Sequence, residues 1–253
     1  MTEMRARIKQ LLPHLFLIDD AGDSTCYLLC GSERALLIDT ANGQENLKEI
    51  VEKLTHLPVT VINTHGHCDH IYGNVYFEKA YLHARDLSLM EAHFGFFKEY
   101  MDEHRLTPCP VKTIEIGDTL DLGNLTVEIV DLKGHTPGSI GILDKKDRIL
   151  FSGDGCNNHL WMQLDESLSM AELEETLVLL KQQHAEDFDF ILTGHARDLA
   201  PKAMLDKLMK GVRELREGKT EKDLPYNYFG GQCLQHPLSD IPGECIVYSE
   251  SKL

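Results

Sequence analysis

The chain has 253 residues, 42% of them hydrophobic, and a formal net charge of −16 at pH 7. This length allows one full hydrophobic core, and we expect a single domain over residues 1–253. The acidic charge disfavours nucleic acid and anionic membranes as partners, because binding to either needs basic surface. No apolar run is long enough for a signal peptide or a membrane span. The seven cysteines are scattered and odd in number, which indicates reduced thiols and a cytoplasmic protein.

The first half of the chain reads as strands, then a helix, then a further strand. Apolar runs bounded by turn residues predict strands at 14–19, 24–31, 34–40 and 59–63. Apolar residues recur at helical spacing from Leu47 to Leu54, which predicts an amphipathic helix before the last of these strands. A second helix, predicted over residues 86–105, forms an insertion before the second half.

The second half repeats this order in outline. Strands are predicted at 111–116, 119–122, 125–132, 139–144, 148–154, 188–195 and 244–249. One helix opens at Ser169, where Glu172 completes a capping box, and another begins near Pro201. Two mixed sheets packed face to face, with helices on the outside, would satisfy this order and give an α/β fold.

The densest group of ligand-type side chains comes directly after the predicted buried strand at 59–63. His65, His67, Asp69 and His70 fall within the six residues HGHCDH. Imidazole and carboxylate ligands together suit zinc, iron or manganese. A ligand set without cysteine is more typical of catalytic than of structural zinc. The segment therefore predicts a catalytic metal site.

Three further candidate ligands each follow a predicted strand and stand beside glycine. They are His135 in GHTPGS, Asp154 in SGDG and His195 in TGH. Glycine lets the backbone turn sharply at these points. The histidines without this context are not expected to bind metal, and these are His14, His56, His83, His93, His104, His184 and His236.

Taken together, these segments resemble the metallo-β-lactamase superfamily. The resemblance rests on THGHCDH, GHTPGS, SGDG and TGH in that order, with Asp39 at the end of LLIDT, and it extends from about His14 to the last strand. It implies a four-layer αβ/βα sandwich of two mixed β-sheets with helices outside. It also implies two divalent metal ions, expected to be zinc, with iron or manganese as alternatives.

The resemblance also implies how the ligands are shared. The first metal would be held by His65, His67 and His135. The second metal would be held by Asp69, His70 and His195, with Asp154 bridging the two. Asp69 and Asp154 would then serve catalysis together with a metal-bridging hydroxide.

Less direct signals concern the surroundings of this site. Asp39 would orient the ligand loop from behind, although an aspartate that closes a strand is also a common turn residue. His159 and Trp161 follow Asp154 closely enough to reach a substrate. Phe94 and Phe97 either pack in the core, as their helical stripe indicates, or line an apolar pocket. No base is assigned to Cys68 or Cys156, so no thiol nucleophile is expected.

We therefore expect a dinuclear metal-dependent hydrolase that acts on a small ester, thioester or lactone. An iron-dependent oxidoreductase of the sulfur dioxygenase type, or a non-catalytic metabolite sensor, are the alternatives. The expected partner is a small-molecule substrate. The sequence leaves the oligomeric state open, with a homodimer among the alternatives.

Overall fold

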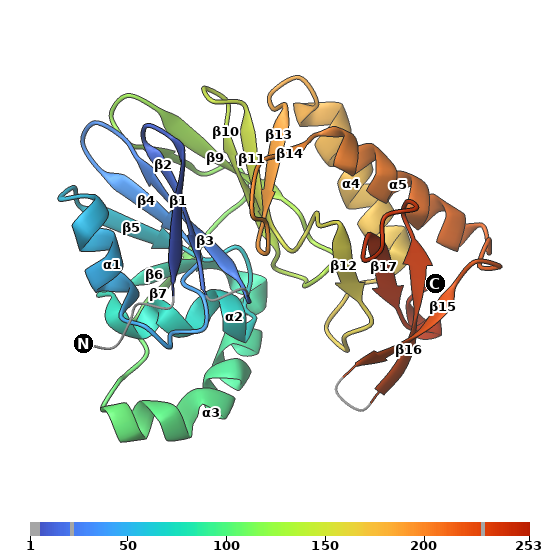
Figure 1. Cartoon of the computed structure of the whole chain (residues 1–253), viewed down its shortest axis with the longest axis horizontal. Helices are drawn as coiled ribbons and strands as arrows, with labels where there is room; N and C mark the ends of the chain where they lie inside the picture. The colour runs from blue at the N-terminus through green and yellow to red at the C-terminus, as the bar shows by residue number, and fades with distance from the viewer. Residues whose placement is uncertain (1–5, 21–22, 229–230) are drawn as a thin grey trace.

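Two large mixed β-sheets pack face to face and form the centre of the molecule. The computed structural model describes residues 6–20, 23–228 and 231–253, and its elements are coloured along the chain in Figure 1. In the first sheet the strands follow chain order, antiparallel from β1 to β4 and parallel from β4 to β7. Its strands are β1 (Arg7–Leu12), β2 (Leu15–Asp19), β3 (Thr25–Cys30), β4 (Ala35–Ile38), β5 (Val59–Ile62), β6 (Ala80–His83) and β7 (Val111–Ile114).

The second sheet has six strands in the order β14-β13-β11-β10-β9-β8. Only β11 and β13 pair in parallel, and the other neighbours are antiparallel. The strands are β8 (Thr119–Asp121), β9 (Thr126–Asp131), β10 (Ile140–Asp144), β11 (Ile149–Gly153), β13 (Phe190–Thr193) and β14 (Ala200–Pro201). The expectation of two mixed sheets in an α/β fold is confirmed.

The period-two pattern of the strands explains how the first sheet is covered on both faces. Leu36 and Ile38 in β4 point into the core between the two large sheets, where they meet residues of the second sheet such as Phe151. Leu37, which points the other way, packs against α1 (Leu47–Leu54). Asn46 caps this helix by accepting a hydrogen bond from the backbone N–H of Glu49.

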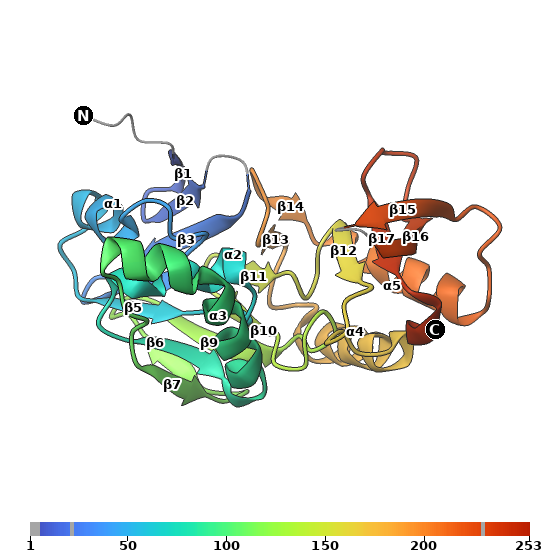
Figure 2. The same ribbon diagram turned by 90° about the horizontal axis from the view of Figure 1, so that it is seen from below.

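A third, four-stranded sheet in the order β12-β17-β16-β15 was not predicted. Figures 1 and 2 place it with α4 and α5 on the side of the second sheet that faces away from the first. Residues 225–228 and 231–236 form most of its antiparallel hairpin. These elements are β12 (His159–Met162), β15 (Leu224–Tyr228), β16 (Gly231–Pro237), β17 (Cys245–Tyr248), α4 (Met170–His184) and α5 (Ala203–Arg216).

The predicted helices agree with the structure, including the insertion, which forms α3 (Leu87–His104). The capping box at the start of α4 is present, with Ser169 and Glu172 each bonded to the other's backbone N–H. The shorter elements are α2 (Cys68–Ile71) and the 3-10 helices η1 (Tyr72–Tyr76), η2 (Ala84–Asp86) and η3 (Glu250–Lys252). Within the described ranges, every helix is too short or too polar to cross a bilayer.

Candidate metal centre

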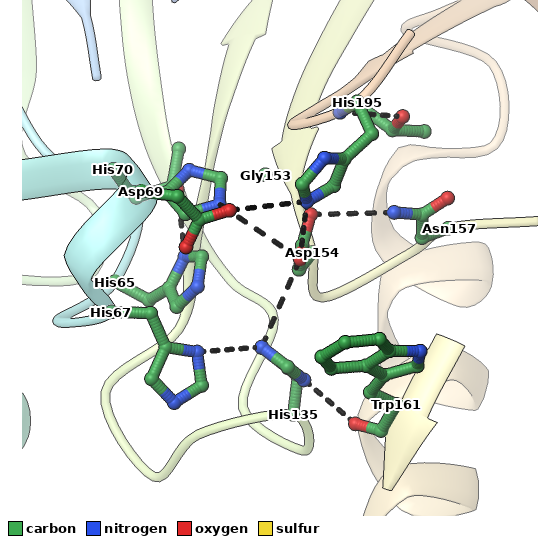
Figure 3. Close-up of polar contacts among 12 residues, drawn as sticks. His65, His67, Asp69, His70, His135, Gly153, Asp154, Asn157, Trp161 and His195 are labelled. Atoms are coloured by element: carbon green, nitrogen blue, oxygen red, sulfur yellow. Dashed lines mark hydrogen bonds and ion pairs between the residues drawn. The ribbon is translucent and has the colours of Figure 1, made fainter. Parts of the chain in front are cut away.

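The candidate ligands meet at one edge of the two large sheets because each follows the end of a strand. His65 comes three residues after β5, and Asp154 directly follows β11. His135 follows β9, and His195 follows β13. Strands of both sheets therefore deliver side chains to one place, and Figure 3 shows these side chains pointing toward one another.

The seven predicted ligands form overlapping groups whose candidate ligand atoms lie within 4.8 Å of one another. One group is His65, His67 and His135. A second group is Asp69, His70 and His195. Asp154 contacts both groups, because its Oδ2 atom lies 3.1 Å from His195 Nε2 and 3.9 Å from His135 Nε2. The structure thus brings together all seven residues that the sequence singled out.

Each of the five histidines also has an acceptor on the side of the ring that faces away from the group. Such a contact fixes the tautomer and aims the other ring nitrogen at a metal. The pairs are His65 Nδ1 with Thr64 Oγ1 (3.1 Å), His67 Nε2 with Glu166 Oε1 (2.6 Å), His70 Nδ1 with Asp39 Oδ2 (2.9 Å), His135 Nδ1 with the Trp161 carbonyl (2.7 Å) and His195 Nδ1 with the Asp23 carbonyl (2.8 Å).

One buried atom tests whether these residues fit a metal ion. The Nε2 atom of His65 is buried and has no hydrogen-bond partner in the described part of the chain. Such an unpaired buried atom costs about 1–3 kcal/mol. A divalent cation among His65, His67 and His135 would satisfy it. The donor set of imidazoles and carboxylates, free of cysteine, fits such an ion.

The electrostatics of the group agree with this reading. Burial acts to raise the pKa of Asp154, but the neighbouring His195 and His70 outweigh it and hold that pKa well below its usual value. Asp154 in turn raises the pKa of His195 to about 9, against the effect of burial. Burial, followed by the effect of His67, lowers the pKa of His135 to about 4. The ionised carboxylate and the neutral His135 are in the forms that bind metal ions, whereas His195 would release its proton on binding.

Asp39 lies where the sequence placed it, behind the ligand loop. It is buried at the end of β4 with a φ of +62°, a conformation that aspartate tolerates better than most residues. Its carboxylate accepts hydrogen bonds from the Thr64 backbone N–H (2.7 Å), the Thr64 hydroxyl (2.8 Å) and His70 Nδ1. It therefore holds the start of the ligand loop and one ligand ring together.

Asp86 is a site residue that sequence reasoning missed. Its fully buried carboxylate accepts hydrogen bonds from the backbone N–H groups of Gly66 (2.9 Å) and Gly138 (2.7 Å) and from the Thr136 hydroxyl (2.6 Å). It thereby ties the loop of His65–His70 to the turn that carries His135. In the sequence it reads as a helix cap, but its side chain does not cap α3.

A pocket of about 730 Å³ opens over the candidate metal centre. His159 and Trp161 line it, as predicted, and Leu164 and Tyr228 add apolar surface. The Tyr228 ring lies 4.5 Å from that of Trp161, edge to face. His93, which was not expected to bind metal, also lines the pocket. Its Nδ1 atom accepts a hydrogen bond from the Cys68 backbone N–H.

Phe94 and Phe97 do not line this pocket, which corrects one of the two alternatives for the α3 stripe. Phe94 is buried in a small core with Ile71 and Met90. Phe97 stacks on Tyr72, with ring centroids 4.0 Å apart, and borders a separate hollow. The helical period of the stripe reflects packing, because α3 turns these side chains toward the protein interior.

The thiols near the site are poor nucleophiles. Burial raises the pKa of Cys156 to about 12, and this residue belongs to the core beneath the second sheet. Burial, followed by the charge of Asp69, raises the pKa of Cys68. Because the thiolate is the reactive form of cysteine, neither Cys68 nor Cys156 is suited to act as the nucleophile.

Replacing Gly194 by alanine is expected to disturb the second ligand group. A Cβ atom there would stand 2.4 Å from His70 Cε1 and 2.6 Å from Asp154 Oδ1. Relieving such crowding costs about 1–3 kcal/mol and displaces the ligands, so the purified variant should retain less metal. Gly95→Ala in α3, where a Cβ meets nothing within 4 Å, is the control. Wild-type metal content in Gly194→Ala would contradict this arrangement.

Comparison with known proteins agrees with the fold and the ligand geometry. The chain belongs to the metallo-beta-lactamase superfamily, whose family model matches residues 19–195. Among solved structures, a metallo-beta-lactamase from Pontibacter korlensis superposes with a TM-score of 0.64 at 16% identity, over 82% of this chain and 99% of that one. A sec-alkylsulfatase from Pseudomonas sp. gives a TM-score of 0.67 at 13% identity, over 84% of this chain and 42% of that one. These likenesses concern the fold.

Two kinds of curated relative share part of the sequence. The acyl-coenzyme A thioesterase MBLAC2 of Homo sapiens is 26% identical over 157 residues, which are 51% of this chain and 56% of that protein. A hydroxyacylglutathione hydrolase of Erythrobacter litoralis is 31% identical over 120 residues, 46% of this chain and 41% of that protein. The chain thus matches only about half the length of these relatives.

Proposed function

We propose that the protein is a metal-dependent hydrolase that uses two divalent ions to cleave a small carboxylic thioester, ester or lactone. The observation that carries the proposal is the position of Asp154, whose carboxylate lies between a three-histidine group and a second group of two histidines and Asp69. Family membership supports hydrolysis. The ligand chemistry supports zinc, with iron or manganese as alternatives.

The chain's own residues prepare the site for hydrolysis. When bound, two divalent ions would supply a Lewis acid for the substrate carbonyl and would lower the pKa of a bound water. The carboxylates of Asp154 and Asp69 offset the positive charge. Asp69 also lines the pocket, where its carboxylate would accept a hydrogen bond from the attacking water and orient it. The contacts behind the histidines hold the rings in place, so little reorganisation is needed during reaction.

The pocket favours a substrate with an apolar acyl part, because Trp161, Leu164 and Tyr228 are among the residues that line it. A thioester is the preferred member of the class, because two relatives are named as thioester hydrolases, an acyl-coenzyme A thioesterase and a hydroxyacylglutathione hydrolase. A cytoplasmic location remains part of the proposal, and all seven cysteines are unpaired.

The first test is hydrolysis by metal-loaded protein. Protein loaded separately with zinc, manganese or iron would be assayed against acyl thioesters of increasing chain length, lactones and phosphodiesters. Turnover of thioesters or lactones, lost on chelation and restored by metal, is the expected result. Oxygen uptake by the iron form without hydrolysis would instead favour an oxidoreductase. Absence of turnover with every metal and substrate would contradict the proposal.

Trp161→Ala is expected to weaken the use of longer acyl chains. The variant removes the indole ring but keeps the backbone carbonyl that bonds His135. Losing about 50 Å² of apolar contact costs roughly 1.3 kcal/mol, or about tenfold in kcat/KM. Short acyl groups that do not reach the wall should be affected less. Phe96→Ala, at a residue that is 82% exposed on α3, serves as the control. An equal loss for all chain lengths would show that Trp161 does not contact the acyl group.

A further inference from the structure

Glu166 contacts a candidate metal ligand from the opposite half of the chain. It lies in the loop between β12 and α4, and its Oε1 atom is 2.6 Å from Nε2 of His67. The His67 side chain is 8% exposed and that of Glu166 is 27% exposed, so water screens the pair only partly. The two residues are 99 positions apart in the sequence, and no motif marks Glu166.

The loop that carries Glu166 is itself fastened beside the metal centre. The hydroxyl of Ser167 donates to the His135 carbonyl (3.0 Å), and the backbone N–H of Leu168 donates to the Gly134 carbonyl (2.8 Å). From the other side, the Lys252 amine donates to the carbonyls of Asp165 (3.0 Å) and Ser167 (2.6 Å). These four hydrogen bonds fix the backbone of the loop on both sides of Glu166, and the fixed loop keeps the Glu166 carboxylate against His67.

This contact decides which nitrogen of His67 faces the other ligands. When Glu166 accepts a hydrogen bond from the Nε2–H group of His67, the lone pair of His67 Nδ1 points to the centre, and this Nδ1 atom lies 2.9 Å from Nε2 of His135. The carboxylate of Asp39 does the same for His70 in the second group. Each of the two ligand groups thus has one imidazole backed by a carboxylate, which raises the basicity of that ligand more than a carbonyl would.

We propose that Glu166 is a positioning residue that fixes the tautomer and orientation of His67 for the first metal ion. The inference rests on the proposed two-metal centre. The inference goes beyond the ligand set, because it gives the loop before α4 a role in metal affinity. With Glu166 in place, the first ion would bind more tightly than it would to the histidines alone. His93, whose ring centroid lies 5.2 Å from that of His67, borders the same contact.

The test is a metal titration of four variants of the full chain, of which His93→Ala serves to detect a third ion. Glu166→Ala should bind one of two zinc equivalents about 10–100-fold more weakly and leave the other unchanged, as measured by competition with a chromophoric chelator. Glu166→Gln, whose amide oxygen can still accept a hydrogen bond from the Nε2–H group of His67, should recover part of the loss. Asp165→Ala removes an exposed carboxylate from the same loop and is the matched control. In the cobalt-substituted protein, Glu166→Ala should alter the visible absorption of one ion only.

The outcomes separate this inference from the proposed function. Zinc affinity of Glu166→Ala within twofold of Asp165→Ala would overturn it. A second result would also overturn it: three ions per wild-type chain, one of which is lost in both Glu166→Ala and His93→Ala. Glu166 would then be a metal ligand together with His67 and His93, whose candidate ligand atoms also lie within 4.8 Å of one another. A wild-type protein that binds two ions but hydrolyses nothing would defeat the proposed activity and leave the role of Glu166 standing.

Discussion

Replacing Asp154 by alanine is expected to abolish hydrolysis while the protein still folds. The variant removes the carboxylate that contacts both ligand groups, and so weakens the hold on both ions. Because such ions contribute several kcal/mol to the stabilisation of the transition state, kcat/KM should fall by about 10³-fold or more. The measurements are steady-state kinetics and metal content by elemental analysis.

The Asp154→Ala variant should fold, because Asp154 follows β11 and is not part of the apolar core. Circular dichroism would test this expectation. Asp165→Ala, which removes one exposed carboxylate elsewhere, should keep its activity. His67→Ala should behave like Asp154→Ala, because it takes one ligand from the first group. Hydrolysis within tenfold of wild type in either ligand variant, or in protein freed of metal, would rule out this mechanism.

Replacing Asp86 by alanine should destabilise the fold as well as the centre. The buried N–H groups of Gly66 and Gly138 would lose their acceptor. Each unpaired buried donor costs about 1–3 kcal/mol, so the free energy of unfolding should drop by about 3 kcal/mol. The two ligand loops would also lose the contact that joins them, and zinc should bind more weakly. Urea unfolding of the metal-free protein measures the loss of fold stability without any contribution from zinc binding.

The comparison variant for Asp86 is Asp102→Ala in the same helical segment. Asp102 forms an exposed pair with Lys98 one turn away, with side chains 66% and 68% exposed. Such a pair contributes about 0.3–0.5 kcal/mol. If Asp86→Ala lowers the free energy of unfolding no more than Asp102→Ala does, water replaces the Asp86 carboxylate and the two ligand loops do not depend on this side chain.

The two large sheets could be predicted because their strands carry local signals. Continuous apolar runs such as ALLI in β4 and ILFSG in β11 are buried over their whole length, as expected for strands covered on both faces. Strand β1 was missed because RIKQLL is mostly exposed and polar, typical of an edge strand. Strand β6 was missed because AYLH, with alanine and histidine in it, is not a continuous run of strand-forming residues. The third sheet was missed because tyrosine, glycine and proline in β15 and β16 resemble a loop.

The ligands could be predicted because histidine and aspartate stand beside glycine at strand ends. Their supporting residues could not. Asp86 lies 50 positions from Thr136, and Glu166 lies 99 positions from His67. Neither spacing is a local pattern, and each carboxylate alone reads as an ordinary helix start or surface residue. Only the tertiary fold brings such pairs together, so sequence reasoning finds the centre before it finds what holds the centre in place.

The ligand set joins the two large sheets at one edge. His65 and His70 follow β5 of the first sheet, while Asp154 and His195 follow β11 and β13 of the second. Ions coordinated from both sides would link the two sheets, so the sheets could not move apart there without breaking coordination. Loss of the proposed ions and local opening of the sandwich at this edge would then be a single event, and the rate of local opening would set how long the ions stay bound.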